Sequence, residues 1–133
     1  MIPQVYSIMK EKDMFILSAR DLCSKEYPSD FMIWKKKAFE IIPDRLNISL
    51  QIPTNLISIG DSPLEMEATK ELGQKFDKAI VKLVKLEECL TAQSMVKQAD
   101  LLLLILQDLL LSTKNRNIDM KVVNREEVKK WYK

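Results

Sequence analysis

The stretch that most constrains the fold of this chain is residues 55–68, where an apolar run ends at Gly60, an acid follows, and a proline opens the next segment. Pro63 suits the first turn of a helix, because its missing N–H would have no partner there. The order strand, glycine turn and helix places Asp61 at the carboxyl end of a strand, the edge at which open α/β sheets bind ligands. Glu65 follows in the first turn of the helix, and two such carboxylates suit Mg²⁺, which takes oxygen ligands. A strand–turn–helix joint with solvated acids explains this stretch equally well.

Composition removes several classes of site. The 133 residues contain no histidine, which excludes Ser-His-Asp and Cys-His catalysis and histidine metal ligands. Only two glycines occur, so the sequence has no Gly-rich dinucleotide-binding or phosphate-binding loop. A net charge of +2, with the lysines scattered among acids, gives no basis for a nucleic-acid partner. Carboxylates, lysine, serine and a bound metal remain as the chemistry of a site.

Cysteine spacing and hydropathy bear on the compartment. Cys23 and Cys89 lack Cys-x-x-Cys spacing, so we expect reduced thiols instead of a zinc site or a disulfide framework. The amino terminus shows no secretion signal. The apolar run over residues 101–111 is interrupted by Gln107 and Asp108 and is too short to span a bilayer. We therefore expect a cytoplasmic protein in which this run is a buried helix, with no membrane partner.

Apolar periodicity divides the chain into alternating helices and strands. Asp30 is a preferred N-cap for a helix that follows it, and Gly73 is placed to end another helix as its C-cap. The alternation indicates an α/β fold with a mainly parallel sheet flanked by helices. No change of composition marks a domain boundary, so we expect a single domain. Helices are predicted over residues 3–12, 31–42, 63–72 and 94–111, and strands over residues 14–17, 55–59, 78–84 and 118–123.

Two further predictions concern the C-terminal part of the chain. Residues 118–123 alternate apolar and polar, as a half-buried edge strand does, so residues 114–133 are expected to form an edge strand and a charged tail. In the helix over residues 94–111, we expect one apolar face to be buried. That face consists of Val96, Ala99, Leu102, Leu103, Leu106 and Leu110.

Three motifs resemble those of the haloacid dehalogenase-like (HAD) phosphohydrolase superfamily. Residues 60–65, a Gly-Asp pair with an acid four residues after the Asp, resemble its fourth motif. Residues 15–18, an apolar run that ends in serine, resemble its second motif. Lys35 resembles the lysine of the third motif, ahead of the two lysines that follow it. The order and spacing agree over residues 13–85, and the combination is also similar to an uncharacterised branch found in unicellular eukaryotes.

This resemblance implies a Rossmann-like three-layer fold and Mg²⁺-dependent hydrolysis of a phosphate-bearing small molecule. By the resemblance, Asp61 ligates Mg²⁺, and Glu65 ligates it or orients its waters. Ser18 would hold a phosphate oxygen, and Lys35 would stabilise the phosphate and the charge of the nucleophile. From the residues alone, Ser18 is also consistent with a strand-end hydroxyl and Lys35 with a solvated helix face.

The first motif of that family, Asp-x-Asp after the central strand, occurs nowhere in this chain. It supplies the nucleophile and the acid that protonates the leaving group, and Asp13 lies at the wrong end of its predicted strand to replace either. We therefore expect no hydrolysis at an enzymatic rate. The family's central first strand, which lies between the strands predicted over residues 14–17 and 55–59, is missing too. Those two strands must then pair directly, or the sheet must borrow a strand.

Three interpretations follow from this departure. The chain is the carboxyl-terminal part of a phosphatase, a binding or interaction protein that keeps the shape of the site without its nucleophile, or an unrelated α/β domain. In the second, unpaired strand edges favour self-association or a protein partner, because free N–H and C=O groups are a template for pairing.

Overall fold

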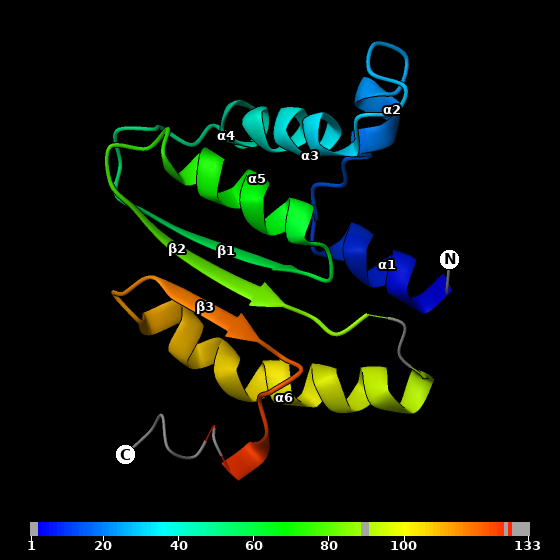
Figure 1. Ribbon diagram of the computed structural model, residues 1–133, viewed down its shortest axis with the longest axis vertical. Coiled ribbons are helices and arrows are strands. Elements are labelled where there is room, and N and C mark those ends of the chain that lie inside the picture. The colour runs from blue at the N-terminus through cyan, green and yellow to red at the C-terminus, as the bar shows by residue number, and fades with distance from the viewer. Residues whose placement is uncertain (1–2, 89–90, 127, 129–133) are drawn as a thin grey trace.

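The structure is a computed structural model that describes residues 3–88, 91–126 and 128 (Figure 1). Within these residues three parallel strands pack against helices, which confirms the α/β class. The strands are β1 (Thr54–Gly60), β2 (Ala79–Lys85) and β3 (Arg116–Asp119). The helices are α1 (Pro3–Glu11), α2 (Ala19–Cys23), α3 (Phe31–Glu40), α4 (Ile42–Arg45), α5 (Pro63–Gly73) and α6 (Ala92–Leu111).

The described strands lie in the order β1, β2, β3, so β2 is central and β1 forms one edge of the sheet. Both strand pairs are parallel, and Gly60, Lys85 and Asp119 are aligned in register at their carboxyl ends. Strands of parallel sheets that lie between helices are often apolar without strict alternation, and this holds for Leu56–Ile59 of β1, apart from Ser58, and for Ala79–Val81 in the first half of β2. The carboxyl edge predicted for a ligand is formed by these three aligned positions.

Helix α5 covers one face of the sheet and buries Met66, Ala68, Thr69 and Leu72. Its last residue, Gly73, lies so close to β2 that a Cβ atom there would come within 2.6 Å of Val81 Cγ2. The φ angle of Gly73 is not positive. Gly73 is therefore a contact residue inside α5, and its predicted role as a C-cap beyond the helix is wrong.

Helix α6 covers the opposite face, where Ile105 and Leu109 are fully buried against the sheet. Lys82 of β2 is fully buried on the same face. Its ammonium donates hydrogen bonds to the carbonyl oxygens of Leu109 and Ser112, the second at 2.6 Å. These carbonyls end α6, where they have no helical partner, so Lys82 closes the last turn. Burial lowers the pKa of Lys82 below the ordinary lysine value.

Helix α3 packs against α5 (Figure 1). Asp30 begins it as predicted, because its carboxylate accepts a hydrogen bond from the Ile33 N–H at 2.9 Å. Trp34 and Ala38 are its buried residues. A single residue, Ile41, lies between α3 and α4, and Pro43 lies in the first turn of α4, a position that suits proline.

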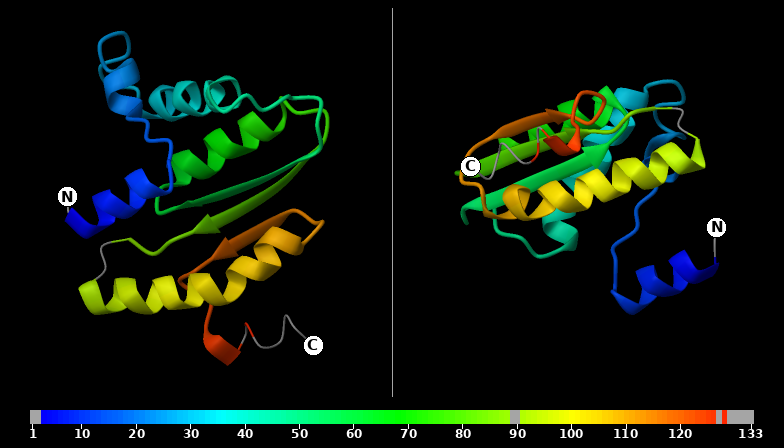
Figure 2. Two further views of the ribbon diagram at one scale, coloured as in Figure 1. Left: turned by 180° about the vertical axis from the view of Figure 1, so that it is seen from behind. Right: turned by 90° about the horizontal axis from the view of Figure 1, so that it is seen from below.

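The N-terminal part of the described chain contains the predicted helix, as α1, but departs from the predictions after it. Helix α1 buries none of its side chains and projects from the rest of the fold (Figure 2). The following segment, Met14–Leu17, pairs with no described strand, and Met14, Phe15 and Ile16 are 55%, 45% and 60% exposed. The predicted strand over residues 14–17 is therefore wrong for this chain. A short apolar run becomes a strand only beside a neighbour with free N–H and C=O groups, and β1 is not paired with it.

The predicted buried face of the long helix is wrong in part: Leu102 packs against the core and Leu106 is partly buried, but other members of the face are exposed. Val96, Leu103 and Leu110 of α6 are exposed, Leu103 by 68%, whereas Ile105 and Leu109 meet the sheet. The C-terminal half of α6 is apolar on more than one side. Periodicity therefore identifies a helix but not the side of it that a sheet covers.

Smaller differences lie near the ends of the chain. Helix α2 forms where the pattern predicts a strand end and a loop, and it buries the free thiol of Cys23. Strand β3 begins two residues before the predicted edge strand and ends at Asp119. Cys89 and most of the predicted charged tail lie outside the described residues. None of the helices in the described part of the chain combines the length and hydropathy that a membrane span requires.

Candidate functional site

The candidate site lies at the carboxyl end of β1, where the chain turns into α5. Ser62 caps this helix, because its Oγ accepts a hydrogen bond from the Leu64 N–H at 3.2 Å, and Pro63 occupies the first turn. The turn therefore forms for the reasons that the sequence indicates. Gly60 is buried and Asp61 is exposed at this position.

Lys35 of α3 and Glu65 of α5 meet at this end of β1. Lys35 Nζ lies 2.5 Å from Glu65 Oε1, and the two side chains are 35% and 22% exposed. A short contact between an ammonium and a carboxylate is a charge-assisted hydrogen bond, stronger than a neutral one. The other carboxylate oxygen lies over Gly60, where an added Cβ atom would come within 1.9 Å of it. The absence of a side chain at Gly60 therefore leaves room for the carboxylate that pairs with Lys35.

Two further ion pairs join α3 to α5 or to the residues just after it: Lys36–Glu71 and Lys75–Glu40. An ion pair between these helices is therefore not by itself evidence of a functional site. Lys36 pairs with Glu71 at 2.5 Å; its side chain is about as exposed as that of Lys35, whereas Glu71 is more exposed than Glu65. That hydrogen bond raises the pKa of Lys36. Of the two lysine–glutamate pairs, Lys35–Glu65 is the one whose carboxylate lies over the strand end. Lys36–Glu71 is therefore a matched control for it.

Ser18 and Asp61 make different contacts from this pair. Ser18 caps α2, where its Oγ accepts a hydrogen bond from the Asp21 N–H at 3.2 Å. Among the described residues, no hydrogen bond or ion pair joins Ser18 to the other predicted site residues. Asp61 lies in the turn between Gly60 and α5. It follows the end of β1 directly, and Glu65 follows four residues later in α5. The structure thus brings Lys35 to Glu65 and leaves Ser18 on a separate helix start.

The donor set at this edge fits Mg²⁺ only in part. No group of three or more Asp, Glu, Cys or His side chains suited to a metal occurs among the described residues. Asp61 and Glu65 supply carboxylates, but Glu65 is already bound to Lys35. Mg²⁺ commonly takes one or two carboxylates and completes its octahedron with waters and substrate phosphates. These residues would therefore hold Mg²⁺ only together with oxygens from a ligand.

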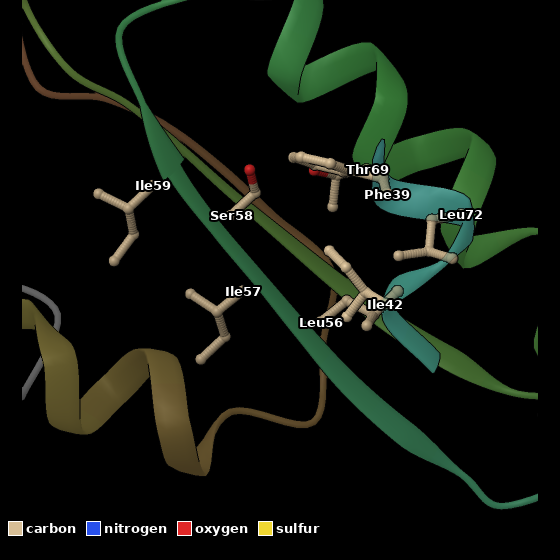
Figure 3. Close-up of a pocket in the computed structure, with 8 residues that line it drawn as sticks. All are labelled: Phe39, Ile42, Leu56, Ile57, Ser58, Ile59, Thr69 and Leu72. Carbon is tan, nitrogen blue, oxygen red and sulfur yellow. The ribbon is translucent and has the colours of Figure 1, made fainter. Parts of the chain in front are cut away.

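A cavity of about 320 Å³ lies beside β1, on the side of helices α3 and α5 (Figure 3). Leu56 and Ser58 point toward the helices, and Ile57 and Ile59 point to the other side of the strand (Figure 3). The lining is mostly apolar, and the Thr69 hydroxyl already donates to the Glu65 carbonyl oxygen at 2.8 Å. Sequence reasoning missed this cavity, although a strand that is apolar on both sides and lacks a neighbour is its signal. The lining residues are Phe39, Ile42, Leu56, Ile57, Ser58, Ile59, Thr69 and Leu72.

Comparison with known proteins adds no relative: no family model, curated protein sequence or solved structure matches this chain. The chemistry of the site is therefore judged from its own residues and contacts.

Proposed function

We propose that this chain is a HAD-like phosphohydrolase domain in a catalytically incomplete form. It binds a phosphate-bearing small molecule at the carboxyl end of β1 without hydrolysing it at an enzymatic rate. The ion pair between Lys35 and Glu65 carries the proposal, because it unites the lysine of α3 with the acid that follows the Gly60–Asp61 turn. The resemblance to the third and fourth motifs of the family assigns these two residues to one site, Lys35 to the phosphate and Glu65 to the metal. The fold is then a Rossmann-like sheet without its first strand, since β1 lies at an edge and not inside the sheet.

Lys35 is the residue that holds phosphate oxygens in this proposal. Its side chain is partly exposed, so a ligand can reach the ammonium, and Glu65 compensates its charge when no ligand is bound. A phosphate dianion would share that ammonium through charge-assisted hydrogen bonds. Phosphoryl transfer also needs a nucleophile in line with the leaving group, and the chain lacks the Asp-x-Asp that supplies it.

Mg²⁺ binds weakly in the same proposal. When bound, it would neutralise phosphate oxygens. Asp61 would be its ligand, and Glu65 would ligate it or orient its waters. Because Glu65 is held by Lys35, we expect metal binding to be detectable only when phosphate is also present.

A non-catalytic interaction protein built on the same fold is the second candidate. The exposed apolar side chains of the segment Met14–Leu17 and of α6 favour it. Monomeric proteins seldom leave large apolar patches in contact with water, and such patches mark interaction sites. This candidate requires a protein partner and no phosphate.

Titration with inorganic phosphate in the presence of Mg²⁺, followed by heteronuclear NMR, tests the proposal. We expect shifts of the Lys35, Asp61 and Glu65 signals. Lys35→Met should abolish the shifts at the other two residues. Lys36→Met, which breaks a pair of the same length between the same helices, should preserve them. Unchanged signals at Lys35 and Asp61 up to millimolar phosphate would remove this site from consideration.

Hydrolysis of an aryl phosphate separates binding from catalysis. With pure protein and Mg²⁺, we expect no turnover above the uncatalysed rate, because the nucleophile motif is absent. Turnover that disappears in Asp61→Ala would mean that another residue serves as the nucleophile, and would contradict a catalytically incomplete domain.

A further inference from the structure

The open edge of β1 carries polar groups that can be assigned residue by residue. The Leu86 N–H donates to the Gly60 carbonyl oxygen at 2.8 Å, so Gly60 turns its backbone toward β2. Because these directions alternate along a strand, Asn55, Ile57 and Ile59 turn their N–H and C=O groups away from β2. No strand among the described residues pairs with them. β1 therefore offers three donors and three acceptors to an extended peptide.

The segment Met14–Leu17 has the complementary properties. It is apolar, lies in no helix or strand, exposes Met14, Phe15 and Ile16, and pairs with no strand among the described residues. A segment of this kind satisfies its own N–H and C=O groups by adding to an open sheet edge. The cavity beside β1, with Phe39 and Ile42 on the helix side, offers apolar surface to the side chains of an added strand.

We propose that Met14–Leu17 of one copy pairs with the open edge of β1 in a second copy, and the reverse, to form a symmetric dimer. This proposal does not depend on phosphate binding. Each contact removes the apolar segment and the strand edge opposite it from water. A standard stable interface buries on the order of 1,600 Å² in total, and two reciprocal contacts supply apolar area toward it from the exposed Met14, Phe15 and Ile16 of each copy. Reciprocal exchange also closes the assembly, because each copy gives one segment and receives one.

Other pairings of these groups fit less well. Phe39 and Ile42 place α3 and α4 beside β1. Two β1 edges that met across a twofold axis would have to accommodate these helices from both copies. The other edge of the described sheet, β3, is four residues long and has Arg116 and Asp119 at its ends. Short edges with charged residues resist pairing, so β1 is the edge that accepts a strand.

Two substitutions separate the two halves of the contact. Ile16→Asp places a charge in the segment, at a side chain so exposed in the single chain that the monomer fold should not change. Ile59→Pro removes an N–H that faces the open edge, so the hydrogen bonds between β1 and β2 remain. Ile59→Val keeps that N–H and is the matched control.

Sedimentation velocity at micromolar concentrations measures the result. We expect a wild-type dimer, and in Ile59→Pro a dissociation constant about thirtyfold higher, since two interchain hydrogen bonds are lost. Ile16→Asp should weaken the dimer at least as much, because a charge is buried in both contacts. An equimolar mixture of the Ile16→Asp and Ile59→Pro chains should dimerise better than either alone. In the mixed dimer, one contact combines an intact segment with an intact edge.

The alternatives give different patterns, and each overturns the proposal. A wild-type monomer would mean that Met14–Leu17 does not pair with β1 of a second copy. A dimer that Ile59→Pro breaks but Ile16→Asp leaves intact would indicate pairing between two β1 edges. A dimer that survives both substitutions would place the contact elsewhere, for example on the exposed side of α6 around Leu103.

Discussion

Replacing Gly60 by alanine tests how the candidate site is built. An added Cβ atom would lie 1.9 Å from Glu65 Oε2, and the next contact beyond Glu65, Met66 Cε at 3.7 Å, is an ordinary one. The φ angle of Gly60 is not positive, so alanine suits the backbone. The clash is thus with the end of one flexible side chain, and Glu65 must rotate away from Lys35.

The expected cost to stability is small, because two effects of similar size oppose each other. A partly exposed ion pair contributes about 0.5–1 kcal/mol. Glycine in a strand is about 0.5–1 kcal/mol less favourable than alanine, so the substitution recovers a similar amount. The free energy of unfolding of Gly60→Ala should therefore stay within about 1 kcal/mol of wild type. Gly73→Ala is the contrast: its Cβ would meet Val81 Cγ2 at 2.6 Å, inside the packed face of the sheet. Overpacking costs about 1–3 kcal/mol, of which a better helix residue returns up to about 1.

Urea unfolding and the NMR signals of the Lys35 side chain separate these effects. Gly60→Ala should shift the Lys35 signals and leave the unfolding midpoint close to wild type. Gly73→Ala should lower the midpoint and leave Lys35 unchanged. A Gly60→Ala chain that keeps the wild-type Lys35 signals, or that loses more than about 2 kcal/mol, would refute the geometry assigned to Glu65.

Two other substitutions address the opposite face of the sheet. Burial lowers the pKa of Lys82 in the folded chain below the ordinary 10.5. At a pH below this lowered pKa, Lys82 is protonated in both the folded and the unfolded chain, and the folded chain bears the full cost of burying the charged ammonium. Between the two values the unfolded chain binds more protons, so the free energy of unfolding should rise with pH there, and Lys82→Met should remove this rise in urea titrations. Leu109→Ala should cost about 2–4 kcal/mol, whereas Leu103→Ala, exposed on the same helix, should cost less than about 0.5 kcal/mol. Equal losses at the two leucines would contradict the assignment of the buried side of α6.

Elements with a local signal could be predicted from the sequence. The apolar run before Gly60 and the Ser62–Pro63 start of α5 determine a strand, a turn and a helix within a few residues. Asp30 specifies the start of α3 in the same way. The run over residues 14–17 has the composition of a strand, but a strand also needs a neighbour, and neighbours come from elsewhere in the chain or from another chain. The strand prediction for residues 14–17 is therefore wrong because local composition does not show whether a neighbouring strand is available.

The Lys35–Glu65 pairing at the candidate site could be predicted only in part from the sequence. Residues 35–37 are three consecutive lysines, and composition alone does not distinguish them. The rotation of α3 against α5 does, because it directs Lys35 to Glu65 and Lys36 to Glu71. The resemblance to a known motif favoured Lys35 without knowledge of that rotation. The cavity beside β1 has no such motif, since it lies at an edge of β1 that no described strand covers.

Ser18 shows why the role of one residue can depend on where a whole segment is placed. Its Oγ accepts a hydrogen bond from the Asp21 N–H, yet a hydroxyl can accept one bond and donate another, so the cap does not exclude a phosphate ligand. What decides is the position of the segment that precedes it. If Met14–Leu17 added to β1 as a parallel strand, the Ser18 that follows would reach the carboxyl edge of the sheet beside Gly60. While the segment stays unpaired, the hydroxyl serves only α2. The local sequence determines the apolar run and the serine that follows it. Which sheet edge this segment pairs with depends on the whole assembled sheet.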